Sequence, residues 1–285
     1  MISGLCTLSR ANYLCYPYVE AITSFLPVVD EMVIALDFYS GDGTRETLLK
    51  EFDGLRLVPV VFDIAKYGWI SYGIAQTTGY QACKGDVVMM FNADGVLHEK
   101  DVGLLRQRMK EQEQNAKEPF AYWMKNRFYG PTLYYNQYKH SGVYTKKFLG
   151  DRFHFYFKRY KGVPNTGLKT AGEGFRKLDV KHYGYEHLWD TEDVVREKVN
   201  NYGRMIDQVD YKYDVEKHES KDGQEIDVLV YKKPEYYYDE YVRHLVDRLK
   251  KDGKQMPIDQ QPKIIQEKLR SINETHFGYN CFGKR

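Results

Sequence analysis

Short apolar runs alternate with helix-like segments through the first hundred residues, and this alternation constrains the possible folds more than any other feature. The run Val87–Phe91 is apolar at five consecutive positions, which is typical of a strand buried on both faces, because a half-exposed strand would alternate. Similar runs cover residues 2–8, 32–36 and 55–62, with helical patterns between them over 17–27, 45–52 and 72–83. The series predicts an α/β fold with a mostly parallel sheet and helices on both of its faces.

Polar residues follow the fourth apolar run directly, beginning with Asn92-Ala93-Asp94. An acid at the end of a buried parallel strand lies at the carboxyl edge of the sheet, where open α/β folds bind their ligands. We therefore expect Asp94 to be an edge carboxylate at the protein surface that is available to a ligand. A turn, or the cap of a helix that begins near Lys100, is the alternative interpretation.

The second half of the chain has a less regular pattern. A charged helix is expected over 102–114, strands and long loops over the aromatic and basic segment 120–160, a loop over 162–174, a last short strand over 180–185 and a helix over 191–205. A boundary near residue 206 then divides an α/β domain, 1–205, from a small α+β extension, 206–285. The extension is expected to hold a hairpin around Asp222-Gly223 and helices over 235–251 and 262–272.

Composition excludes several classes of protein. With 285 residues, of which 42% are hydrophobic and 29% charged, the chain can form one large domain, or one domain and an appendage. The formal net charge of +2 gives no global field that marks a nucleic-acid or membrane binder. No apolar run is long enough to span a membrane and no signal segment opens the chain, so we expect a cytoplasmic protein. The four cysteines have no metal-binding or disulfide spacing and are expected to be reduced.

Several motifs occur together, at the expected strand ends and helix starts. They are Arg10, Tyr16-Pro17-Tyr18-Val19-Glu20, Leu26-Pro27-Val28-Val29-Asp30-Glu31, Asp42-Gly43-Thr44, Gln76-Thr77, Gly85-Asp86, Asn92-Ala93-Asp94 and His182-Tyr183-Gly184-Tyr185. In this order the chain resembles family 2 glycosyltransferases of the GT-A fold, in a bacterial and viral subgroup. The resemblance covers roughly residues 1–205, and residues 206–285 match no family that we can name.

The resemblance implies an inverting glycosyltransferase that uses a nucleotide-diphosphate sugar, with a UDP-sugar most expected, and Mn²⁺ or Mg²⁺. Such hard cations prefer oxygen ligands and neutralise the leaving diphosphate. Asp94 stands where the last acid of the family's Asp-x-Asp motif would be, whereas Asn92 replaces the first acid. His182 matches the family's C-terminal histidine, which can complete the metal shell. A lone histidine is more often structural.

The nucleotide half of the site is expected at the ends of the earlier strands. The resemblance implies that Asp37 would hold the base, that Arg10 would bind phosphate oxygens, and that Asn92 could face the ribose or a metal-bound water. The donor-binding residues expected are Thr7, Arg10, Asp37, Gln76, Asn92 and Asp94. Loop formation by Asp37, a surface ion pair of Arg10 and a helix-surface position of Gln76 are the alternatives. No Gly-x-Gly-x-x-Gly or Gly-Lys-Thr/Ser motif supports a dehydrogenase or a P-loop enzyme.

Glu173 is the candidate general base, since the loop Ala171–Gly174 occupies about the place of the family's acidic catalytic motif. Inverting displacement needs such a group to accept the proton of the acceptor hydroxyl. A solvated glutamate between two glycines is an equal alternative. Glu99, Asp101 and Asp151 are the acids to consider if Glu173 has no role.

Two other functions stay open from the sequence. The missing first acid is compatible with a non-catalytic module that binds sugars or nucleotides. Basic and aromatic residues interleave over 120–161 and 232–254, a pattern that nucleic-acid grooves use, so the acceptor could be hydroxymethylated DNA rather than a glycan or another hydroxyl compound. Packing of the extension onto the catalytic domain is the commonest explanation of such a surface.

Overall fold

The computed structural model describes residues 1–62, 69–114, 120–146, 157–160, 163–166, 175–210, 213–219, 225–231 and 234–282. Its strands are β1 (Ile2–Leu8), β2 (Glu31–Asp37), β3 (Arg56–Val60), β4 (Val87–Met90), β5 (Gly95–Leu97), β6 (Phe120–Phe128), β7 (Leu133–Thr145), β8 (Phe157–Tyr160), β9 (Val163–Thr166), β10 (Phe175–Tyr185), β11 (Tyr213–Glu219), β12 (Glu225–Tyr231) and β13 (Lys254–Gln255). The α-helices are α1 (Tyr18–Phe25), α2 (Thr44–Glu51), α4 (Trp69–Ala82), α5 (Val102–Gln114), α7 (Glu192–Asp210), α8 (Pro234–Asp252), α9 (Lys263–Arg270) and α10 (Phe277–Phe282). Short 3-10 turns lie at Leu26–Val28, Glu99–Asp101 and Ile258–Gln260.

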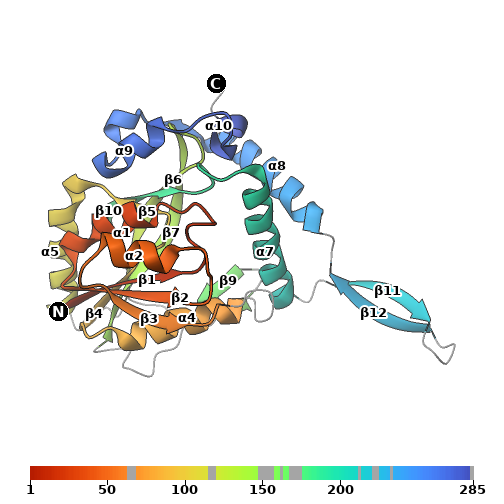
Figure 1. Cartoon of the computed structure of the whole chain (residues 1–285), viewed down its shortest axis with the longest axis horizontal. Helices are drawn as coiled ribbons and strands as arrows, with labels where there is room; N and C mark the ends of the chain where they lie inside the picture. Colours follow the sequence, from red (N-terminus) through yellow and green to blue (C-terminus); the bar gives the residue numbers. More distant parts are fainter. Residues whose placement is uncertain are drawn as a thin grey trace.

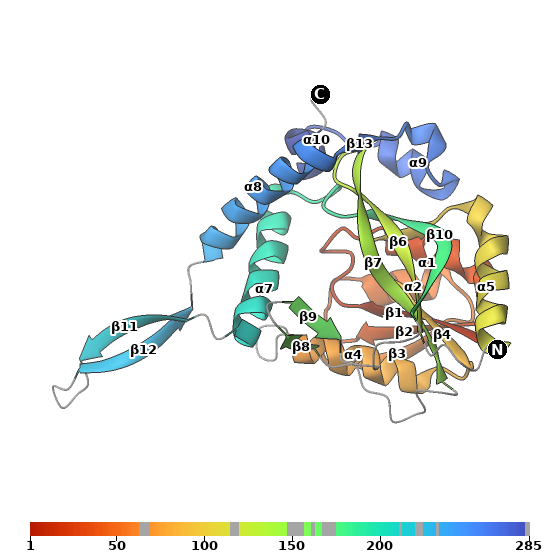
Figure 2. The ribbon, with the colours of Figure 1, turned by 180° about the vertical axis from the view of Figure 1, so that it is seen from behind.

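One mixed sheet forms the centre of the molecule, in the order β3-β2-β1-β4-β7-β6-β10-β5, with β13 paired to β7 (Figure 1). The four strands β3, β2, β1 and β4 are parallel, as the alternating pattern predicts. Helices α1, α2 and α5 cover one face of this part of the sheet, and α4 lies on the other (Figure 2). The predicted α/β architecture in three layers is therefore confirmed.

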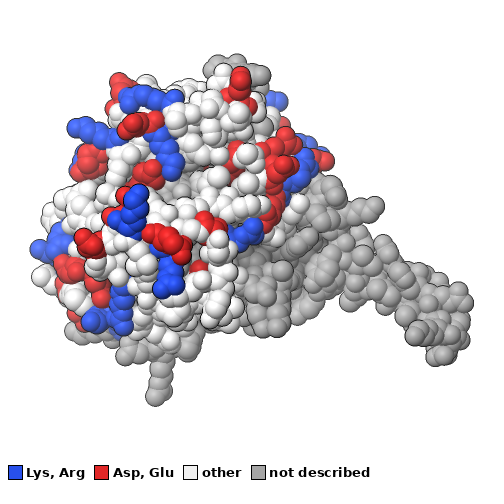
Figure 3. All heavy atoms as spheres, in the orientation of Figure 1, with Lys and Arg blue, Asp and Glu red and all other residues white. Residues whose placement is uncertain are grey.

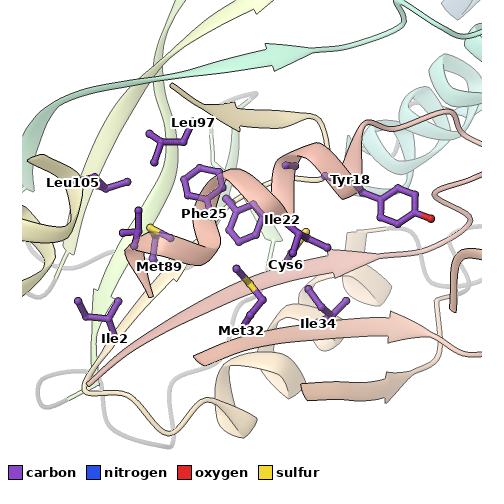
Figure 4. Packing of buried hydrophobic residues seen from close by; sticks show 14 of the residues in the cluster. Ile2, Cys6, Tyr18, Ile22, Phe25, Met32, Ile34, Met89, Leu97 and Leu105 are labelled. Carbon is purple, nitrogen blue, oxygen red and sulfur yellow. The ribbon is translucent and has the colours of Figure 1, made fainter. Parts of the chain in front are cut away.

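The parallel strands are buried on both faces because their side chains point alternately to two apolar clusters. Cys6 and Ile34 belong to the cluster under α1 (Figure 4), whereas Leu5 and Val33 belong to the cluster under α4. Phe25, at the end of α1, stacks on the Phe91 ring with a centroid separation of 4.3 Å. This continuous apolar packing explains why every residue of the run from Val87 to Phe91 is hydrophobic.

The other half of the sheet contains most of the antiparallel pairs. Strand β7 pairs antiparallel with both β4 and β6, β10 is parallel to β6, and β5 is antiparallel to β10. The three-residue strand β5 was not expected, because it is too short to show a period. Strand β10 begins five residues earlier than its predicted start, and β9 occupies part of the predicted loop 162–174, paired with β8.

The C-terminal segment is partly built onto the sheet. The boundary expected near residue 206 falls within α7, so the division into two domains stays a prediction. Strands β11 and β12 form the expected hairpin, which projects from the body (Figure 1). Strand β13 extends the sheet beside β7, and Ile265 and Leu269 of α9 join a cluster with Val96 and Phe128. Among the described residues, no helix combines the length and apolarity needed to cross a membrane.

Candidate functional site

Polar residues gather at the carboxyl edge of the parallel strands, as the sequence predicts. In the register of the sheet, Leu8 is opposite Leu36 and Leu5 is opposite Met90, so β1, β2 and β4 run in the same direction beside one another. The segments that follow these strands therefore begin at one edge of the sheet, where ligands bind in open α/β folds. Asp37 is the last residue of β2, and the segments that follow the strands carry Arg10, Asn92 and Asp94.

Asp94 is held in a tight turn between β4 and β5. The Gly95 amide donates to the Asn92 carbonyl at 3.0 Å, and the Tyr185 amide donates to the Asp94 carbonyl at 2.8 Å. Asp94 is only 4% exposed. The expectation of a surface carboxylate is therefore wrong, because β5 and the end of β10, neither of them visible from the local sequence, enclose the residue.

Two cations from β6 engage the acids at this edge. The Lys125 ammonium donates to Asp94 Oδ2 at 2.5 Å and to Glu186 Oε1 at 3.2 Å, and Arg127 forms an ion pair with Glu186. The Lys125 side chain is 0% exposed, and this burial lowers its pKa, while the charge of Asp94 opposes the shift. We call Asp94, Lys125, Arg127 and Glu186 the edge cluster. Two carboxylates meet two cations in it, so its formal charges balance.

Two glycines make room for this arrangement. A Cβ atom at Gly184 would lie 1.6 Å from Lys125 Cε, and a Cβ atom at Gly95 would lie 2.9 Å from the ring of His182. Both glycines are adjacent in the register of β10 and β5. Their missing side chains are thus required for the lysine stem and the imidazole to pack where they do.

His182 lies beside the edge cluster, on β10. It is opposite Lys125 on β6 and opposite Leu97 on β5, and it is almost completely buried. Burial lowers the pKa of His182 to about 3, assisted by the positive charge of Lys125. Its imidazole is therefore neutral at physiological pH. The structure brings His182 and Asp94 together as the sequence predicts, but it also places Lys125, which was not predicted, in direct contact with the acid.

The edge cluster does not fit the divalent metal that the resemblance implies. Lys125 engages Asp94, and both cations engage Glu186, so neither carboxylate is open as a metal ligand. Within the described residues, no group of three or more His, Cys, Asp or Glu side chains is placed to hold a metal ion. Asn92 adds no charge in the place of the acid that it replaces.

The residues expected for the nucleotide base and phosphates have partners within the fold. Asp37 is buried and accepts hydrogen bonds from the Ser9 hydroxyl at 2.8 Å and from the Tyr39 amide at 3.1 Å. The Tyr39 side chain beside it is 82% exposed. Arg10 has a positive φ of 51° and donates to Glu197 of α7 at 2.7 Å. The loop-forming role of Asp37 and the ion pair of Arg10 are thus both observed, and neither excludes contact with a ligand.

Gln76 and Thr7 lie deeper in the same region. Gln76 is buried in α4 and hydrogen-bonds Tyr72, whose raised pKa reflects burial first and also the charges of Cys6 and Asp94. Its alternative interpretation as a helix-surface residue is therefore wrong. Thr7 is on β1 opposite Ala35.

A second buried ionic group, which sequence reasoning missed, lies at the start of α7. Asp190 accepts from Lys198 at 2.7 Å and is 2.9 Å from His187 Nδ1. The Lys198 ammonium also lies 4.0 Å from the centroid of the Tyr16 ring. Burial acts to raise the pKa of Asp190, but the hydrogen bond to His187 and the charge of Lys198 outweigh it and lower that pKa. The only sequence signal was an acid just before a helix, with a lysine eight residues later.

The expected catalytic base, Glu173, lies outside the described residues, as does Asp151. Of the other acids considered, Glu99 accepts a hydrogen bond from the Lys263 amide at 3.2 Å. Burial raises the pKa of Asp101, which lies in the same 3-10 turn.

Comparison with known proteins gives distant structural similarities. Neither a family model nor a curated protein matches the sequence. Similar solved structures include TarS of S. aureus in complex with UDP-GlcNAc, at 15% identity and a TM-score of 0.45, over 75% of this chain and 68% of that one. Mannosyltransferase PcManGT from Pyrobaculum calidifontis, in complex with GDP-Man and Mn²⁺, has 13% identity and a TM-score of 0.46, over 75% and 65%. Glucosyl-3-phosphoglycerate synthase from Mycobacterium tuberculosis, in complex with Mn²⁺, UDP and phosphoglyceric acid, has 10% identity and a TM-score of 0.46, over 81% and 87%.

Proposed function

We propose that this chain transfers a glycosyl group from a nucleotide-diphosphate sugar to an acceptor hydroxyl. The observation that carries the proposal is the position of Asp37, Gln76, Asp94 and His182 near the carboxyl edge of the parallel strands in one mixed sheet, in the order of the motifs quoted above. Such an edge binds ligands in open α/β folds. A uridine nucleotide is the donor that we propose, with Asp37 and the exposed ring of Tyr39 next to its base.

The chemistry requires positive charge near the diphosphate and a base near the acceptor. As the acceptor oxygen forms a bond to the anomeric carbon, the bond from that carbon to the diphosphate breaks, and the electron pair leaves with the nucleotide. Preorganised cations stabilise the charge that develops there. Arg127, supported by Lys125, is our candidate for this role. Glu173 stays our proposed base, which would accept the hydroxyl proton and give inversion at the anomeric carbon.

The acceptor that we propose is a glycan or another small hydroxyl compound. Figure 3 shows charges of both signs interspersed on one face, without a continuous basic stripe in its described part. Duplex binding normally relies on many phosphate contacts, which make the affinity fall steeply with salt. Hydroxymethylated DNA is the alternative, and a gel shift at low salt with plain and hydroxymethylated duplexes separates the two.

The donor can be tested by calorimetry with UDP, GDP and their sugar conjugates, followed by a hydrolysis assay with each conjugate that binds. We expect a uridine nucleotide to bind, and Asp37→Asn to weaken that binding about tenfold by removing a charged acceptor. Asp53→Asn is the matched control, because Asp53 is exposed on a loop after α2. If no nucleotide binds in either EDTA or Mn²⁺, the proposed function is wrong. If nucleotide binds but no sugar is hydrolysed or transferred, the chain is a binding module.

A further inference from the structure

We propose that Lys125, with Arg127, takes the place of a divalent cation at the edge cluster, so that this chain holds its donor without a metal. The statement about metal stands on the described side chains alone. The statement about the donor rests on the proposed function. The inference departs from the resemblance, which implies a metal at Asp94 and His182.

The position of the Lys125 side chain is fixed by the surrounding strands. Its strand is fixed by pairing with β7 on one side and β10 on the other. Its stem passes over Gly184, where any Cβ atom would overlap Cε. The side chain is fully buried, and its ammonium reaches two carboxylates, so both its stem and its charge are held by the surrounding strands.

The formal charges of the edge cluster cancel. Asp94 and Glu186 carry two negative charges, and Lys125 and Arg127 carry two positive charges. The edge cluster therefore has no excess negative charge to attract a divalent ion. A metal placed on Asp94 would also face the Lys125 ammonium, which lies 2.5 Å from the same carboxylate oxygen. Metal sites for Mn²⁺ or Mg²⁺ normally supply uncommitted oxygen ligands, and none is present among these side chains.

Arg127 and Lys125 differ in solvent exposure, and we assign them different roles for this reason. The Arg127 side chain is 21% exposed, whereas Lys125 is enclosed. Arg127 is therefore the group that a diphosphate would contact, with the planar fork suited to phosphate oxygens. Lys125 is a positioning residue. It neutralises Asp94, and its buried charge adds to the positive potential that Arg127 presents to the diphosphate.

The metal statement is tested with Mn²⁺ alone, by electron paramagnetic resonance of free and bound ion. We expect no Mn²⁺ bound by the wild type at the site, and a new binding site in Lys125→Met, which removes the positive charge beside Asp94 and keeps both carboxylates. The double variant Asp94→Asn with Lys125→Met is the matched control and should lose the new site. Mn²⁺ bound by the wild type and lost in Asp94→Asn would overturn the inference, as would a folded Lys125→Met that gains no Mn²⁺.

Folding of the variants is checked by circular dichroism. If Lys125→Met does not fold, Lys125→Gln replaces it, because the amide also removes the positive charge, keeps both carboxylates and can still hydrogen-bond within the site. The same gain of Mn²⁺ is expected in that variant, and its absence counts against the inference in the same way.

The donor statement is tested by calorimetry with UDP. We expect wild-type affinity in EDTA to equal that in Mn²⁺ within about twofold, and Arg127→Gln to weaken it about tenfold or more in both buffers. Binding that occurs only with Mn²⁺ would overturn the inference and leave the proposed function standing. No binding in either buffer would overturn the proposed function, while the Mn²⁺ experiment would still decide the metal statement.

Discussion

The two halves of the central sheet differ in the kind of residue that they bury. Around β1, β2 and β4 the buried residues are apolar almost throughout, with Leu5, Val33 and Val88 in one layer. Around β6 and β10 the interior holds the edge cluster and His182 among aromatic rings. Apolar packing stabilises folding with little regard to orientation, whereas buried charges are tolerated only when each has its partner. The parallel half is thus an apolar scaffold, and the half with antiparallel pairs contains the buried ion pairs.

The largest effect is expected where a buried charge loses its partner. Asp94→Ala leaves the Lys125 ammonium buried with one carboxylate fewer and should reduce the free energy of unfolding by about 3–5 kcal/mol. Urea denaturation measures this. Asp94→Asn with Lys125→Met, which removes both charges, should recover part of the loss. If Asp94→Ala is as stable as the wild type, the ion pair does not form in solution and the contrast between the halves fails.

A slightly smaller effect is expected in the apolar half. Leu5 is fully buried and packs against Gly79 of α4, so Leu5→Ala should cost about 2–5 kcal/mol through lost burial and a cavity. Leu49→Ala is the matched control, because that leucine is 59% exposed. Thermal and urea unfolding should separate the two variants clearly. Nucleotide affinity of the folded Leu5→Ala protein should stay normal, and a large loss would show that the scaffold also shapes the site.

The pH dependence of stability tests the environment of His182. Its folded pKa of about 3 lies below the value of about 6.5 in an unfolded chain, so between these values only the unfolded state takes up the proton. Stability from this residue is complete above pH 6.5 and falls as the pH decreases, by up to about 1.4 kcal/mol per pH unit. His182→Gln should flatten the profile between pH 6 and 4 relative to the wild type. Parallel profiles would show that His182 is protonated within the fold.

The smallest effect is expected for an ion pair at the surface of the scaffold. Arg106 of α5 donates to Asp30 at 2.7 Å, and both side chains are about a third exposed. Exposed pairs contribute little because water and salt screen them, so Arg106→Ala should cost about 1 kcal/mol or less. Urea denaturation at low and high salt measures it. If Arg106→Ala lowers the free energy of unfolding as much as Asp94→Ala does, exposed and buried ion pairs do not differ in this protein.

The sequence by itself determined the parallel half of the molecule. Continuous apolar runs such as Val87–Phe91 can be satisfied only by strands buried on both faces, and the helical periods between them require crossovers. The ends of those strands then placed Asp37 and Asp94 at one edge. Such patterns are local, so they can be recognised without knowledge of the rest of the chain.

Only the tertiary structure decided what surrounds Asp94. Lys125 and His182 are 31 and 88 residues away along the chain, and they meet the acid because β6 and β10 are adjacent strands. The local sequence gives no sign that Gly184 makes room for Lys125, since this role depends on a lysine of the neighbouring strand. Strand β5 likewise forms only because β10 pairs with it. Burial and ion pairing depend on residues that are distant in the sequence. For this reason Asp94, expected at the surface, is instead the partner of a buried lysine.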